Sequence, residues 1–200
     1  MIRRPLLPAA ALCATLALAA CNNSPEAGRP DATPPSTPTT ATPTAPTTPI
    51  YTAEEQAAIA AAKARYVAAR AAVDNAFANP TNFNRAALVK AGVGGNWILA
   101  VTQDVSSLKS FGWYRAGRVK IPSTQVDSVK LDNSQPEVRL TNCIDTSAVV
   151  TRFRKDNKPV PMGPGNGKRH RFKSQLVYAS PSTGGPRIWF LIEDKAAGAC

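Results

Sequence analysis

The sequence predicts an α+β domain in which N-terminal helices pack on one face of a curved antiparallel sheet. Apolar residues recur with a period near 3.6 between residues 52 and 111, and with a period of 2 from residue 113 onward. Short clusters of Pro, Gly, Asp and Asn separate the later apolar runs, as expected of strands joined by turns. We therefore expect one domain over residues 51–200, following a signal peptide at 1–20 and a tether at 21–50.

Residues 1–20 have the features of an export signal. Arg3 and Arg4 precede an apolar run of about sixteen residues, shorter than the roughly twenty that a transmembrane helix needs. The Leu-Ala-Ala-Cys sequence that ends at Cys21 resembles the lipobox of bacterial lipoproteins. This resemblance implies that Cys21 carries a lipid and anchors the protein to the membrane outside the cytoplasm. The alternative is an ordinary secretory peptide that leaves Cys21 as a free thiol.

The tether at 21–50 consists almost wholly of Pro, Thr, Ala and Ser and shows no apolar periodicity. Such a composition cannot bury a core and favours a disordered, extended chain of roughly 3 Å per residue. We expect it to hold the folded domain away from the bilayer.

Thr52 and Glu55 form a T-x-x-E capping box that predicts the start of a long helix, which Asn79 and Pro80 end. Lys63, Arg65, Arg70 and Asp74 are expected off its apolar face. That face comprises Ile59, Ala62, Tyr66, Ala69, Val73 and Phe77.

A short helical segment is predicted over residues 84–91, before a glycine-rich hinge at 92–95. A third helix is predicted over residues 97–111, with Gly112 at its C-terminal cap. The strands are expected to form a meander over residues 113–121, 125–131, 137–144, 148–155, 168–180 and 187–193.

Three short motifs suggest a family: residues 111–117 (FGWYRAG), residues 142–147 (NCIDTS) and the tail at 189–200. With this element order, the chain resembles the NTF2-like (cystatin-related cone) domains and, more narrowly, small secreted lipoproteins of actinobacteria. The family's mid-sheet motif usually reads Asp-Cys-x-Asp, whereas Asn142 stands first here. The resemblance implies a cone-shaped domain but no particular chemistry.

Cys21, Cys143 and Cys200 remain after removal of the signal. If Cys21 is lipidated, an even pair is left in an oxidising compartment, so we predict a Cys143–Cys200 disulfide, with two free thiols as the alternative. The resemblance supports the bond, because the paired cysteines occupy the same two places.

Candidate catalytic residues are few. The single histidine, His170, lies among three cations at residues 168–171, with no orienting acid beside it in the sequence. Asp145 is the best lone acid, but an Asp-Thr-Ser sequence also suits a turn. The sequence has no Gly-x-Ser-x-Gly motif and no metal-ligand spacing. We therefore expect a protein that is not an enzyme and has no cofactor.

The formal net charge is +11, and residues 109 to 187 hold fifteen Lys and Arg against five Asp and Glu. Two neighbouring antiparallel strands could place many of these cations on one face. The predicted anion-binding patch is Arg152, Arg154, Lys155, Lys158, Lys168, Arg169, Arg171 and Lys173. On an exported protein we expect it to meet anionic lipid or acidic wall polymer before nucleic acid. The alternative is a solvated surface with no partner.

The sequence thus predicts a lipid-anchored cell-envelope protein that acts as a non-catalytic binding or interaction module. One alternative is a small-molecule binding protein or enzyme that uses the cone pocket. Another is an accessory subunit that docks with a protein partner in an envelope assembly.

Overall fold

The computed structural model describes residues 50–163, 168–181 and 184–200, so the predicted signal, Cys21 and nearly all of the tether lie outside it. Helix α1 (Ala53–Ala78) begins at the predicted capping box. The Thr52 hydroxyl accepts a hydrogen bond from the Glu55 N–H at 3.2 Å, and the Glu55 carboxylate accepts one from the Thr52 N–H at 2.8 Å. All six residues of the predicted apolar face are buried.

A 3-10 turn η1 (Pro80–Asn82) and helices α2 (Arg85–Lys90) and α3 (Gly95–Ser110) follow. Gly112, directly after the end of α3, has a φ of +67°, as a C-terminal glycine cap requires. The three predicted helices are confirmed, and each of their ends lies within two residues of the predicted position.

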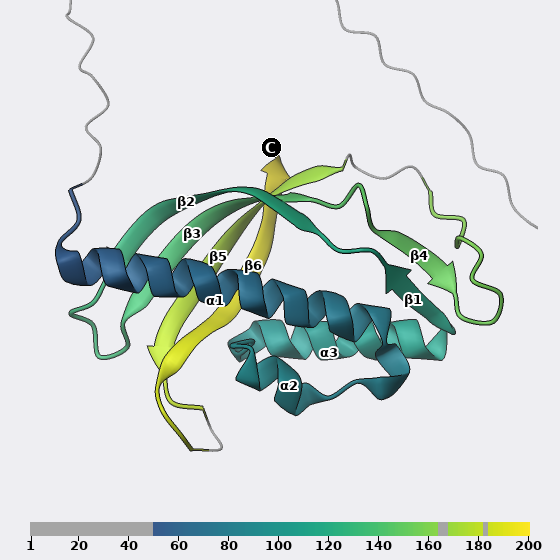
Figure 1. Cartoon of the computed structure of the whole chain (residues 1–200), viewed down its shortest axis with the longest axis horizontal. Coiled ribbons are helices and arrows are strands. Elements are labelled where there is room, and N and C mark those ends of the chain that lie inside the picture. Colours follow the sequence, from purple (N-terminus) through teal and green to yellow (C-terminus); the bar gives the residue numbers. More distant parts are fainter. Residues whose placement is uncertain (1–49, 164–167, 182–183) are drawn as a thin grey trace, which may run out of the picture. The chain divides into compact units, whose positions relative to one another are not determined.

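The main sheet is antiparallel and has the order β2-β3-β5-β6. Its strands are β2 (Lys120–Lys130), β3 (Glu137–Asp145), β5 (Arg169–Ala179) and β6 (Ile188–Ala199). Figure 1 shows these four strands curving together behind α1. The predicted last strand was too short, since β6 continues six residues beyond Glu193.

Strands β1 (Trp113–Ala116) and β4 (Val150–Phe153) form a separate two-stranded sheet, at the right of Figure 1. The predicted single strand over 113–121 is wrong, because the chain turns at Gly117. Gly117 has a φ of +91°, and a Cβ there would overlap the carbonyl oxygen of Ala148. The strands are therefore not one continuous meander.

The helices cover one face of the main sheet, as predicted. Alternate residues of β3 (Val138, Leu140, Ile144) are fully buried, as are Leu176 of β5 and Leu191 of β6. They join the buried faces of α1 and α3 in one core. The intervening residues of β3 and β5 lie on the opposite face, where helices do not cover them. We call this the open face.

None of the helices in the described part of the chain combines the length and apolar character of a membrane-spanning segment.

Candidate functional site

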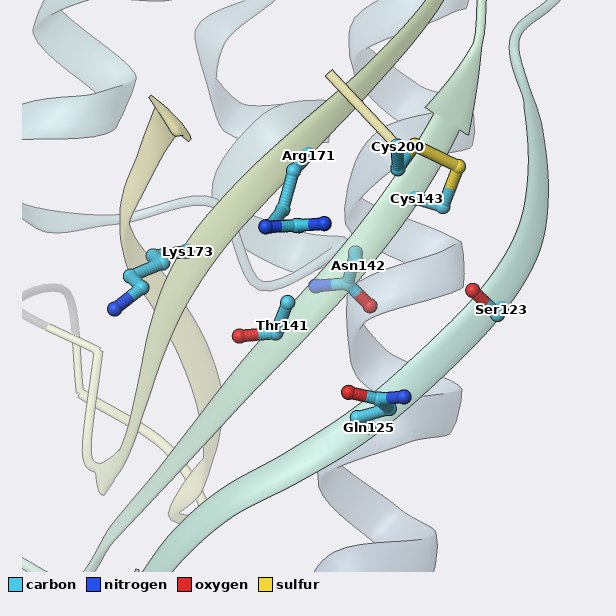
Figure 2. A pocket seen from close by; sticks show the side chains of 8 residues that line it. All are labelled: Ser123, Gln125, Thr141, Asn142, Cys143, Arg171, Lys173 and Cys200. Carbon is cyan, nitrogen blue, oxygen red and sulfur yellow. A yellow bond between two sulfur atoms is a disulfide. The ribbon is translucent and has the colours of Figure 1, made fainter. Parts of the chain in front are cut away.

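The open face has a hollow of about 410 Å³ over strands β2, β3 and β5. Figure 2 shows Arg171 and Lys173 on one side of it, Thr141 in the middle, and Ser123 and Gln125 on the far strand. The strand register explains this grouping, because Thr141 lies between Gln125 and Lys173. We call it the open-face hollow; it is lined by Ser123, Gln125, Thr141, Asn142, Cys143, Arg171, Lys173 and Cys200.

The disulfide forms one wall of this hollow. Cys143 and Cys200 are bonded with their Cα atoms 5.9 Å apart. Cys143 is opposite Arg171 in the register, and the bond joins the C-terminal residue to β3, two strands away from β6. The disulfide therefore fixes the end of the chain beside Arg171 (Figure 2).

Arg171 and Lys173 are the two cations that line the open-face hollow. Both side chains are exposed, and neither has a carboxylate within 4.0 Å among the described residues. Three other cations of this face are paired: Arg139 with Glu137 at 2.6 Å, Arg169 with Asp145 at 3.3 Å, and Lys195 with Glu193. Lys120 and Lys130 of β2 share this face and have no ion pair among the described residues, but they lie outside the hollow. Arg171 and Lys173 are therefore the two cations of β5 without an ion pair in the described part of the chain, and both line the hollow.

The predicted patch is divided by the fold. Strand β4 pairs with β1 and not with β5, so Arg152 and Arg154 are not on a strand next to Arg171, and that part of the prediction is wrong. The Arg152 guanidinium donates to the carbonyl oxygen of Asn157 at 2.7 Å, and that of Arg154 to the Thr81 hydroxyl at 2.8 Å. Lys155 and Lys158 follow β4, whereas Lys168 directly precedes β5, which begins at Arg169.

The two residues weighed for catalysis do not meet. Asp145 accepts a hydrogen bond from the Ser147 N–H at 2.8 Å, which is the turn role that its sequence favoured. Hydrogen bonds from Ser147, supported by Arg169, lower the pKa of Asp145 to about 2. His170 is opposite Ile144 in the register, and Asp145 is opposite Arg169, so the two side chains leave opposite faces of the sheet.

A second hollow lies on the helix side of the sheet, where one of the alternatives drawn from the sequence places a cone pocket. It has a volume of about 350 Å³ and is bounded by α1, α3, β1 and strands β5 and β6. We call it the helix-side cavity; its lining includes Arg70, Val73, Asp74, Phe77, Trp97, Val101, Asp104, Arg115, Phe172 and Asp194.

Behind this cavity lies a buried polar network of Thr124, Asn142, Ser174, Asp194 and Arg70. The hydroxyl of Thr124 donates to Asn142 at 2.7 Å, whose amide nitrogen donates to the Ser174 hydroxyl at 2.8 Å. Ser174 donates to the Asp194 carboxylate at 2.6 Å, and the Arg70 guanidinium donates to its other oxygen at 2.8 Å. The Asp194 side chain is 0% exposed, and burial raises its pKa despite the opposing charge of Arg70.

Asp74 lies one helical turn beyond Arg70. One of its oxygens accepts the N–H of Val119 at 3.1 Å, and burial raises its pKa against the effect of that bond and of nearby arginines. Arg70 and Asp74 were expected off the apolar face of α1, yet both line the cavity. Their positions on α1 could have indicated this, because Arg70 lies about one helical turn before the buried Val73 and Asp74 directly follows it.

Comparisons with known proteins leave the family open. No protein-family model matches the chain, and no curated protein matches it in sequence. A similar solved structure is the crystal structure of the intermembrane space region of chloroplast protein ARC6, with a TM-score of 0.45 and 12% identity. The match covers 72% of this chain and 97% of that chain. We draw no conclusion about fold or function from a likeness at this level.

Proposed function

We propose that this chain is an exported, lipid-anchored cell-envelope protein whose folded domain is a non-catalytic binding module of the NTF2-like type. Its open face meets the phosphate groups of anionic lipid headgroups. The leader-like residues 1–20 and the lipobox resemblance at Cys21 support the location. The order of helices before strands and a cavity between helices and sheet support the fold type.

One observation carries the binding proposal: Arg171 and Lys173 lie side by side on an exposed strand face without carboxylate partners among the described residues. Their i, i+2 spacing points both side chains to the same side of β5. Ser123 and Gln125 add a hydroxyl and an amide group that can donate hydrogen bonds to phosphate oxygens, whereas the Thr141 hydroxyl already donates to the Asp127 carboxylate at 2.7 Å.

The expected binding energy of these two cations suits a contact that supports the lipid anchor. Each Lys or Arg close to an anionic membrane contributes about 1 kcal/mol, and one lipid modification alone holds a protein only marginally. Arg171 and Lys173 together would then contribute about 2 kcal/mol, roughly a thirtyfold change in affinity.

A vesicle sedimentation assay tests this with the oxidised chain from residue 22, which lacks the anchor. We expect binding to vesicles of anionic lipid and not to neutral vesicles. Arg171→Ala/Lys173→Ala should weaken that binding roughly thirtyfold. Lys155→Ala/Lys158→Ala removes the same charge outside the hollow and should weaken it much less.

Equal binding to neutral and anionic vesicles would falsify the proposal. Acidic wall polymer offers the same phosphate chemistry, so soluble polyglycerol phosphate is a second arm of the assay. Binding to that polymer without binding to vesicles would assign the hollow to the wall and refute the lipid assignment.

The accessory-subunit alternative has weaker support. A docking surface for a large assembly is usually a broad apolar patch. In the described strands the open face instead presents Arg, Lys, Glu, Gln, Thr and Ser side chains.

A further inference from the structure

We propose that the helix-side cavity binds a small organic cation, an amine attached to a compact apolar body, with Asp74 as its anchoring carboxylate. This site lies on the opposite side of the sheet from the open-face hollow and does not depend on the anion-binding proposal.

The size and the walls of the cavity fit such a ligand. Its volume of about 350 Å³ falls within the range of small-molecule pockets, about 300 to 1,000 Å³. The walls are mainly apolar and come from both helices and from β5: Val73, Phe77, Trp97, Val101 and Phe172. Pockets of this kind bury the body of a ligand against apolar side chains and orient it with a few polar groups.

Both arginines of the cavity already contact other side chains. Arg70 is paired with Asp194 at 2.8 Å, and its guanidinium carbon lies 5.8 Å from the ring centre of Trp97 and 5.4 Å from that of Phe172. Arg115 lies over the ring of Phe77 at 4.3 Å. The charge of Arg70 is therefore balanced by Asp194, although its Nε has no hydrogen-bond partner in the described part of the chain.

Two carboxylates of the cavity, Asp74 and Asp104, are less engaged than Asp194, which accepts hydrogen bonds on both oxygens. Asp74 makes a single hydrogen bond, from Val119 to one oxygen, among the described residues. Asp104 is exposed on α3 and forms neither a hydrogen bond nor an ion pair in the described part of the chain. An incoming cation would thus find acceptors from both helices, although the chain as a whole carries a charge of +11.

The half-buried position of Asp74 strengthens this complementarity. Burial disfavours its ionised form and raises its pKa even though Arg70, Arg115 and Arg118 oppose that rise, so a cation placed beside the carboxylate would offset more of the cost. Apolar and aromatic walls suit an amine with an organic body better than a metal ion, which prefers a shell of several oxygens.

Three probes of nearly equal size isolate the role of charge: benzylammonium, benzyl alcohol and benzoate. Isothermal titration calorimetry would use the full chain in nanodiscs of neutral lipid, with empty nanodiscs to subtract partitioning. We expect benzylammonium to bind at least about tenfold more tightly than either other probe, since charge-assisted hydrogen bonds contribute about 1.5–3 kcal/mol.

Asp74→Asn should lower benzylammonium affinity about tenfold and leave the other two probes unchanged. Asp132→Asn makes the same chemical change at an exposed site outside the cavity and should have no effect. Ala100→Phe, on the wall formed by α3, should block all three probes by filling the cavity. Circular dichroism of each variant checks that it is folded.

Absence of benzylammonium binding would overturn the proposal. Equal affinity for all three probes would refute the selection for a cation, and undiminished binding by a folded Ala100→Phe variant would refute the location. None of these results bears on the vesicle assay, because Arg171 and Lys173 lie on the other face.

Discussion

Replacing Asp194 by Asn tests whether charge holds the buried polar network together. The ion pair that Asp194 forms with Arg70 is nearly closed to solvent, with side-chain exposures of 0% and 13%. Removing one charge leaves a buried guanidinium uncompensated, which typically costs about 3–5 kcal/mol. We therefore expect Asp194→Asn to lower the free energy of unfolding by that amount, a large part of the about 5–15 kcal/mol available to a domain.

Two further variants make this test specific. Arg70→Met/Asp194→Leu removes both charges, and buried ion pairs replaced by apolar residues often lose little or no stability. We expect a loss of only about 1 kcal/mol, because Ser174 is left without its acceptor. Lys195→Ala breaks an exposed pair with Glu193 on the same strand and should cost less than about 1 kcal/mol.

Equilibrium unfolding in urea at pH 7, followed by tryptophan fluorescence of the oxidised protein, measures all of these free energies. A loss below about 1 kcal/mol for Asp194→Asn would refute the reasoning, since it would mean that the remaining Arg70 charge is solvated. A double variant as unstable as the single one would show that shape, not charge, governs this site.

Three other predictions concern stability. Replacing both Cys143 and Cys200 by Ala should lower the free energy of unfolding by about 4 kcal/mol, because the bond closes a loop with a sequence separation of 57; a loss under about 1 kcal/mol in urea would contradict this entropic account. Gly117→Ala should cost more than Gly112→Ala, since both have positive φ but only at Gly117 does a Cβ meet backbone; equal midpoints of thermal unfolding would contradict it. Because the folded-state pKa of Asp74 is raised above 3.8, the folded protein binds a proton more readily than the unfolded chain, so wild type should gain stability relative to Asp74→Asn as the pH falls from 7 to 4. Urea unfolding in which wild type instead loses stability relative to the variant would be decisive against this.

The elements that the sequence predicted best depend on local chemistry. The start of α1 follows from Thr52 and Glu55, which lie one helical turn apart and bond each other. Its buried face follows from a spacing that any amphipathic helix shows, and Tyr66 and Val73 are buried as expected. These features need no information about distant parts of the chain.

Strand pairing could not be predicted in the same way, because it depends on contacts between distant segments. Gly117 looks like an ordinary residue of an alternating run, and only the backbone of Ala148, which lies against it, shows that the chain must turn there. That turn separates β1 from β2 and gives β4 a partner other than β5. The predicted grouping of Arg152 with Arg171 failed for this reason.

The buried polar network could not be predicted from the sequence for the same reason. Arg70 and Asp194 are 124 residues apart, and nothing in the pattern of either segment links them. Each looks like a solvated charge when considered alone. Their pairing depends on α1 lying across β6, which is a property of the folded domain.

The direction of the hydrogen bonds in this network favours an amide at position 142. Ser174 uses its proton on Asp194, so its oxygen must accept from Asn142. An amide can accept from Thr124 and donate to Ser174 at once, which an ionised carboxylate cannot do. An ionised Asp at 142 would remove that donor and add a second buried carboxylate close to Asp194.

We expect Asn142→Asp to cost about 3 kcal/mol at pH 7, and less at pH 5 where the added acid can be protonated and donate. Urea unfolding at the two pH values, with Asn133→Asp in an exposed turn as the control, measures this. A cost that did not shrink on acidification would show that the polarity of the chain of hydrogen bonds is not what selects the amide.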